Sequence, residues 1–194
     1  MERGGLGAGL LALLRGILGL LDRVAVGLAY LAGAALLLAS FYITLDVLGR
    51  RFAGISSGAT DEFGGYALAV GGMWALAFAL TTGAHVRIDV LLPHFPPRMR
   101  ALLNYAAMVA MAFFAAVLAY YTWKLAIESF VTDARAMSFL RTPLFLPQGC
   151  LALGFTALAA QAIVIFLVGL VESLRRRRFA ELAVLRVKDV TEGL

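Results

Sequence analysis

The sequence predicts an all-α integral membrane protein with four transmembrane helices, an N-terminal amphipathic interfacial helix and both termini in the cytoplasm. The chain has 194 residues, of which 62% are hydrophobic and only 15% are charged. Soluble domains are about half apolar and about a quarter charged. Four apolar runs are each long enough to cross a bilayer. Lysine and arginine gather in alternate connections between these runs, which indicates a defined orientation.

The N-terminal segment, residues 1–23, is expected to lie along the cytoplasmic membrane surface. Its apolar side chains recur at helical spacing and form one stripe, and its basic residues would lie near the headgroups. A signal peptide is disfavoured because Arg15 interrupts the apolar run. The alternative is that this segment joins the first span as one longer helix. The stripe comprises Leu10, Leu11, Leu14, Ile17, Leu18 and Leu21.

A four-helix membrane domain is predicted over residues 24–171, with a basic cytoplasmic tail at 172–194. At 1.5 Å per residue each span covers a hydrocarbon core of about 30 Å. Arg175–Arg178 in the tail would anchor the chain beside anionic headgroups. The predicted spans are residues 24–46, 62–84, 100–124 and 147–171.

The basic residues set the predicted orientation. Of the 17 lysine and arginine residues, 12 fall on the side that holds both termini and the connection around His85, and 5 fall on the other side. The positive-inside rule therefore places both termini and this connection in the cytoplasm. Because the bases adjoin apolar runs, membrane lipids are the expected partner and nucleic acid is not.

The polar residues inside the spans do not predict an enzyme. Their hydroxyl groups have no base at membrane depth that would activate them. One cysteine and two histidines are too few for the usual metal or haem sites. We therefore predict no catalytic, cofactor-binding or metal-binding residue, and no cofactor. Asn104 and Gln161 are expected to form hydrogen bonds between helices.

Two groups of polar residues are candidates for structural or interface roles. Near the connection after the first span, Arg50 or Arg51 is predicted to pair with Glu62. The alternative is ordinary helix capping, with Thr60 as the cap. After the second span, a proline-bounded turn is predicted to fix how the second and third spans meet. Its candidate residues are Gly83, His85, Arg87 and Asp89.

Five short motifs, in their order and spacing, resemble the small permease subunit of tripartite ATP-independent periplasmic (TRAP) transporters. The most specific is the third, which follows the second span. One departure is that Ala77-Phe-Ala-Leu80 lacks a glycine that this family often has late in its second span. The motifs are Val47-Leu-Gly-Arg-Arg51, Asp61-Glu62, Gly83-Ala-His-Val-Arg-Ile-Asp89, Pro96-Pro-Arg98 and Leu146-Pro-Gln-Gly149.

The resemblance implies a small scaffold subunit of a sodium-driven symporter for organic acids in the bacterial inner membrane. Its implied partners are a large TRAP permease subunit, which it would brace, and a periplasmic solute-binding protein, whose docking it would aid. The resemblance implies that this chain has no substrate-binding residue, so its sequence does not identify the transported solute. Two other functions stay open: a stand-alone small membrane carrier or channel, and a membrane assembly factor without a transport role.

Overall fold

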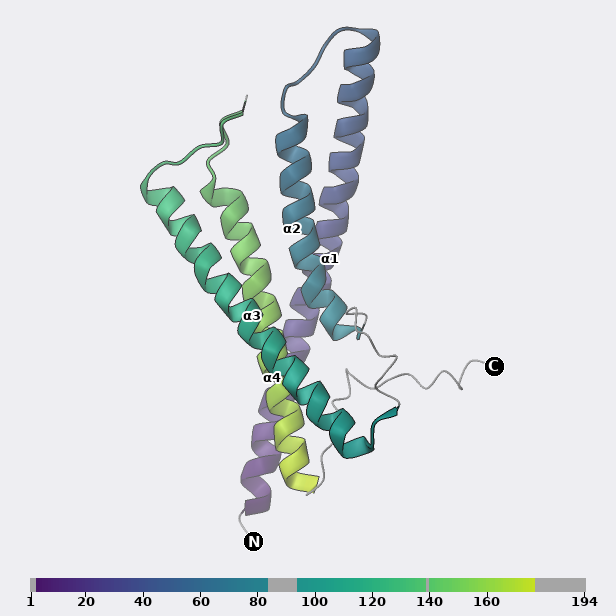
Figure 1. The fold of residues 1–194 in the computed structure, drawn as a ribbon, viewed down its shortest axis with the longest axis vertical. Coiled ribbons are helices and arrows are strands. Elements are labelled where there is room, and N and C mark those ends of the chain that lie inside the picture. The colour runs from purple at the N-terminus through teal and green to yellow at the C-terminus, as the bar shows by residue number, and fades with distance from the viewer. Residues whose placement is uncertain (1–2, 84–93, 139, 177–194) are drawn as a thin grey trace, which may run out of the picture.

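A computed structural model of the chain describes residues 3–83, 94–138 and 140–176. Within these residues the chain forms four helices and no strand (Figure 1). All four helices are long and apolar enough to cross a membrane. The prediction of an all-α protein with four membrane-crossing helices is thus confirmed for this part of the chain. The helices are α1 (Arg3–Phe52), α2 (Thr60–Thr81), α3 (Pro97–Val131) and α4 (Phe145–Arg176).

The first helix is much longer than the predicted span. It has 50 residues, which corresponds to about 75 Å at 1.5 Å per residue. The helix runs without a break across residue 23, where the surface segment was predicted to end. No proline interrupts this stretch, and Asp22 finds a hydrogen-bond partner on α4. In the structure the N-terminal segment and the first span thus form one continuous helix, and the position of this segment along the membrane surface remains a prediction.

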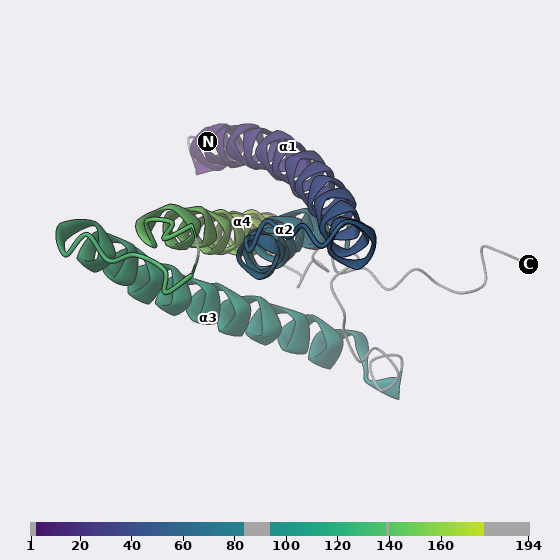
Figure 2. The same ribbon diagram turned by 90° about the horizontal axis from the view of Figure 1, so that it is seen from above.

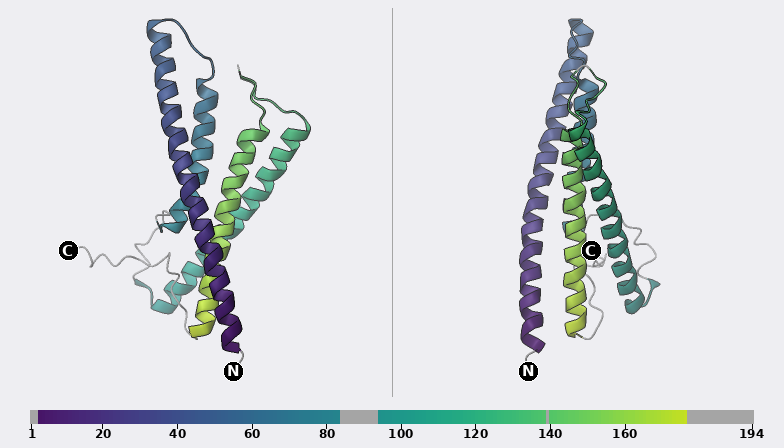
Figure 3. Two further views of the ribbon diagram at one scale, coloured as in Figure 1. Left: turned by 180° about the vertical axis from the view of Figure 1, so that it is seen from behind. Right: turned by 90° about the vertical axis from the view of Figure 1, so that its left-hand side faces the viewer.

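The helices form two antiparallel hairpins, α1 with α2 and α3 with α4. Seen from above, α2 and α4 lie between α1 and α3 (Figure 2), and α4 packs against each of the other three helices. The hairpins diverge toward the end of the bundle that carries the α1–α2 and α3–α4 connections (Figures 1 and 3). We call this end the loop end. The opposite end, where α1 begins and α4 stops, is the terminal end.

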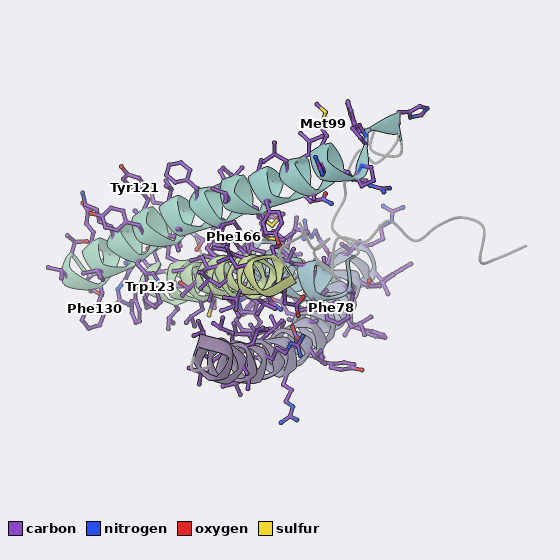
Figure 4. All side chains as sticks on the ribbon, turned by 90° about the horizontal axis from the view of Figure 1, so that it is seen from below. Phe78, Met99, Tyr121, Trp123, Phe130 and Phe166 are labelled. Atoms are coloured by element: carbon purple, nitrogen blue, oxygen red, sulfur yellow. The ribbon has the colours of Figure 1, made fainter. Side chains whose placement is uncertain are left out.

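The buried core lies where the two hairpins cross. Small residues on α4 let the helix backbones approach closely, as is usual in membrane bundles. Phe166 lies between α4 and α3 (Figure 4), where its ring meets Tyr105 edge to face with the centroids 5.8 Å apart. Many other large apolar side chains are exposed on the outer faces of the helices. The core residues are Leu80, Met108, Ala115, Leu158, Ala159, Ala162 and Ile165.

Two connections lie at the loop end. The α1–α2 connection, residues 53–59, turns at Gly54 and Gly58, whose φ angles of 66° and 68° favour glycine. The α3–α4 connection, residues 132–144, forms a short hairpin around the bridge between Arg135 and Pro143. We call this second connection the arm. It extends from the α3–α4 hairpin toward the start of α2 (Figure 1).

Candidate functional site

Asp46 organises the α1–α2 connection. Its carboxylate accepts hydrogen bonds from the backbone N–H of Ser57 at 2.6 Å and from the Thr60 hydroxyl at 2.7 Å. Arg50, one turn further along α1, donates to the same carboxylate at 2.7 Å. The Asp46 side chain is only 4% exposed, so these donors take the place of water around a charged group. The contacts attach the connection and the first residue of α2 to α1.

The structure corrects the predicted pairing of Glu62 with Arg50 or Arg51. Arg50 is held by Asp46, and Arg51 is exposed. Asp46 precedes Arg50 by four residues on the same helix, a spacing that brings the two side chains together at small entropic cost. The acid four residues before Arg50 was therefore the feature of the sequence that indicated the Asp46–Arg50 ion pair.

Glu62 instead joins α2 to the arm. One carboxylate oxygen accepts a hydrogen bond from the Tyr66 hydroxyl at 3.0 Å. The other accepts a hydrogen bond from the hydroxyl of Ser138, which belongs to the arm. Glu62 therefore links the two helical hairpins at the loop end, where the helices themselves diverge.

The start of α2 differs from the predicted cap. The residue at the N-cap position is Ala59, and no side chain caps it. Thr60 is the first residue of the helix, and its hydroxyl donates to Asp46 instead of accepting from the backbone of α2. The predicted capping role of Thr60 is therefore wrong, because the helix begins one residue earlier than predicted and Thr60 lies within its first turn.

Gly83 ends the second helix. Its φ of 68° lies in the left-handed region, and its N–H donates to the carbonyl of Leu80 at 3.3 Å, a common way for helices to terminate. The other residues of the predicted turn, His85, Arg87 and Asp89, lie outside the described residues. Their role in fixing how the second and third spans meet remains a prediction.

We expect replacement of Asp46 by alanine to loosen the α1–α2 connection. The change leaves the Ser57 N–H and the Thr60 hydroxyl without their acceptor, so the melting temperature of the detergent-purified chain should fall by several degrees. Proteolysis within residues 53–59 should also become faster. Asp61→Ala is the matched control because Asp61 is an exposed acid beside the same connection. Equal melting curves for the two variants would show that Asp46 has no such role.

Gln161 joins α4 to α1 through a polar contact inside the bundle. Its side chain is almost completely buried, with the residue 1% exposed, and its amide donates to the Asp22 carboxylate at 2.7 Å. The predicted interhelical hydrogen bond is thus confirmed for Gln161. Asn104 is also buried, on α3, and its hydrogen bond remains a prediction. Asp22 was missed as a site residue because it was assigned to the surface segment.

Two further polar contacts lie nearer the terminal end. Arg15 of α1 forms an ion pair with Glu172 of α4. The hydroxyl groups of Tyr105 on α3 and Ser173 on α4 lie 2.8 Å apart. Together with the contact of Gln161, they connect α4 to both of its long neighbours.

Two indole groups hold the loop-end half of α4. Trp74 of α2 donates to the carbonyl of Cys150 at 2.8 Å, and Trp123 of α3 donates to the Thr156 hydroxyl at 3.0 Å. Between these contacts α2 approaches α4 at Gly154, where a Cβ atom would lie 3.1 Å from Cβ of Met73. α4 is therefore fixed from both sides along most of its length.

The polar groups described so far hold helices together. Most of the contacts join two segments of the chain that are separate in sequence or lie on different helices. In residues 3–83, 94–138 and 140–176, no three His, Cys, Asp or Glu residues gather as a metal site requires. The arrangement is that of a structural bundle with an apolar exterior.

Comparison with known proteins agrees with this architecture. No curated protein and no solved structure matches the chain significantly. The family model described as "Tripartite ATP-independent periplasmic transporters, DctQ component" matches residues 39–175. The match runs from the last third of α1, through Asp46 and the arm, to the end of α4. The chain therefore belongs to the DctQ family and is a small membrane component of a TRAP transporter.

Proposed function

We propose that this chain braces the large permease subunit of a sodium-driven TRAP transporter that takes up organic acids. The complex would reside in the bacterial inner membrane, with both termini of this chain in the cytoplasm. Family membership supports the transporter assignment, and the distribution of basic residues supports the orientation. Sodium coupling and the solute class come from the resemblance to the family.

The observation that carries the bracing role is the contrast between the inside and the outside of the bundle. Buried polar side chains such as Gln161 and Asp46 lie inside the bundle, whereas large apolar side chains are exposed on all four helices. On α1 these side chains extend from Leu10 to Phe52. An apolar exterior of this length suits packing among lipids and other membrane helices, and a solute path through the bundle would need polar groups facing it.

The loop end is the part of this chain that would meet the periplasmic binding protein. The positive-inside rule places this end outside the cytoplasm. It presents exposed apolar side chains: Phe52, the last residue of α1, is 83% exposed, and Ile55 in the connection is 70% exposed. On the arm, Met137 is fully exposed. A binding protein docked at the loop end would bury these side chains.

Charge reversal at Glu62 is expected to weaken assembly with the large subunit. Glu62→Lys replaces the acceptor for Tyr66 and Ser138 by a cation, so the arm loses its attachment to α2 and the loop end changes shape. We expect at least a tenfold lower yield of co-purified complex. Glu62→Gln, which keeps one acceptor oxygen, should lose much less. Wild-type yield and wild-type solute uptake for Glu62→Lys would refute this role.

Reconstitution tests the proposed function as a whole. Proteoliposomes with this chain, the large permease and the binding protein should take up an organic acid when a sodium gradient is applied. Omission of this chain should abolish uptake. Flux through vesicles that contain this chain alone would instead favour a stand-alone carrier. Undiminished uptake in its absence, together with no co-purification, would favour an assembly factor without a transport role.

A further inference from the structure

Contacts between α1 and α2 define how the two helices stand beside each other. Thr60 at the start of α2 lies beside Asp46. Gly71, in the middle of α2, lies against Ala32 and Leu36, since a Cβ there would be 3.2 Å from Cγ of Leu36 and 3.6 Å from the Ala32 carbonyl oxygen. The full length of α2 therefore stands beside about the second half of α1.

The other hairpin is displaced toward the terminal end. Trp74, in the second half of α2, reaches the carbonyl of Cys150, in the second turn of α4. Met73 lies against Gly154. The start of α4 therefore stands beside the middle of α2, and the last third of α4 extends beyond the end of α2. Figure 1 shows the same offset between the two hairpins.

α3 shares the displacement of α4. Its contacts run from Trp123 beside Thr156 to Tyr105 beside Ser173. The middle of the uncharged part of α3 accordingly stands beside about residue 166 of α4, whereas the middle of the uncharged residues 63–83 stands beside about residue 152. At 1.5 Å per residue this difference is about 20 Å along the bundle.

Charges of one hairpin consequently lie level with the apolar part of the other. Lys124 and Glu128 are exposed on α3 and stand beside the second half of α2. The Arg15–Glu172 pair stands level with the first uncharged turns of α3. A bilayer perpendicular to the helices would put one of these sets into hydrocarbon, at a cost of about 2.5–3.5 kcal/mol for each charge near the centre.

We infer that the bilayer contacts the bundle along an oblique belt, so that the helices are inclined to the membrane normal. The belt runs from the α1–α2 hairpin near the loop end to α3 near the terminal end, and lipid hydrocarbon covers it. Inclination keeps the charges of both hairpins at the two membrane surfaces. It also keeps more of the long α1 within the bilayer than an upright helix would. Exposed apolar residues of the belt include Leu37, Leu38, Leu68, Val109, Phe113 and Phe114.

Nitroxide accessibility to oxygen and to an aqueous nickel chelate tests this orientation. The labels are attached to single cysteines in the full chain with Cys150→Ala, in vesicles of phosphatidylethanolamine and phosphatidylglycerol. Ala75→Cys and Ile127→Cys occupy the same level along the bundle and are both exposed. We expect the label at Ala75 to lie in hydrocarbon and the label at Ile127 to lie at the headgroups. Phe113→Cys, 14 residues from Ile127 on α3 and so about 21 Å further along the bundle, should match Ala75.

An upright bundle gives a different result. The labels at Ala75 and Ile127 would then have equal depth, and the label at Phe113 would differ from both; that outcome overturns the inference. Protection of Phe113 from both reagents would show that protein covers the site, and would also overturn it. The measurement needs no partner subunit, so its result is independent of the proposed bracing role.

Disulfide crosslinking tests the offset between the hairpins. In Met73→Cys with Gly154→Cys the two Cβ atoms would lie 3.1 Å apart, so a shift of a few tenths of an ångström brings them into disulfide range, and the pair should crosslink in the Cys150→Ala background. Met73→Cys with Gly169→Cys would crosslink only if the hairpins slid until their apolar parts were level. We expect at least a tenfold difference in favour of the first pair. Preferential crosslinking of the second pair would overturn the oblique belt.

Discussion

Gly154→Leu should lower the free energy of unfolding by about 2–3 kcal/mol, a typical cost for forcing a larger side chain into a packed contact. The first carbon of the new side chain would lie 3.0 Å from Cδ1 of Trp74 and 3.1 Å from Cβ of Met73, with the Met73 backbone carbon at 3.4 Å. Because part of this surface is backbone, α2 must move away from α4. The hydrogen bond from Trp74 to Cys150 should then lengthen or break.

The loss is measured by detergent-induced unfolding of the purified chain, with indole fluorescence as a second readout. Gly149→Leu is the matched control on the same helix, because no atom lies within 4 Å of a Cβ at that position. Leucine is a better helix former than glycine by up to about 1 kcal/mol, so the control should be unchanged or more stable. Equal destabilisation by the two substitutions would show that the close approach at Gly154 is not responsible.

Gln161→Leu should cost about 1–2 kcal/mol of unfolding free energy. The substitution keeps the volume roughly constant and removes the donor to Asp22, which leaves a partly buried carboxylate oxygen without that bond. In double-mutant cycles, where both partners are replaced, a hydrogen bond between membrane helices contributes about 0.6 kcal/mol to stability on average. The double variant Asp22→Leu with Gln161→Leu should therefore be more stable than Gln161→Leu alone.

The same substitution at Gln148 is the control. Gln148 also lies on α4, but its Oε1 atom is buried without a hydrogen-bond partner in the described structure. Removing an unsatisfied polar atom relieves a desolvation cost, so Gln148→Leu should be neutral or stabilising in the same detergent assay. If the double variant were no more stable than Gln161→Leu alone, the contact between α1 and α4 would not be the source of the loss.

The four helices could be predicted because the bilayer imposes a simple requirement on sequence. Each segment needs about 20 apolar residues without charge, and the four segments can be counted along the chain. The interhelical role of Gln161 was also predictable, since an amide within an apolar run needs a partner. Its partner was not predictable, because Asp22 is 139 positions away and meets it only through the register of α1 against α4.

Local competition decided the details at the loop end. Arg50 had two acids within plausible reach, Asp46 and Glu62. The continuation of α1 through Phe52 places Arg50 one turn from Asp46. The arm then occupies Glu62 through Ser138. Sequence analysis selected Arg50 and Glu62 as candidates but not Asp46, and the choice of partner depended on where the helix ends.

By itself, the sequence determined the class of the protein, the number of membrane-crossing helices and the family motifs, because hydrophobicity and local spacing are properties of neighbouring residues. Only the tertiary structure decided that α1 is one continuous helix, that Asp46 and Glu62 hold different parts of the loop end, and that the two hairpins are offset along the bundle. Those features arise from close packing at glycines, alanines and indoles between distant segments. That packing determines which residues meet, and no single segment encodes it.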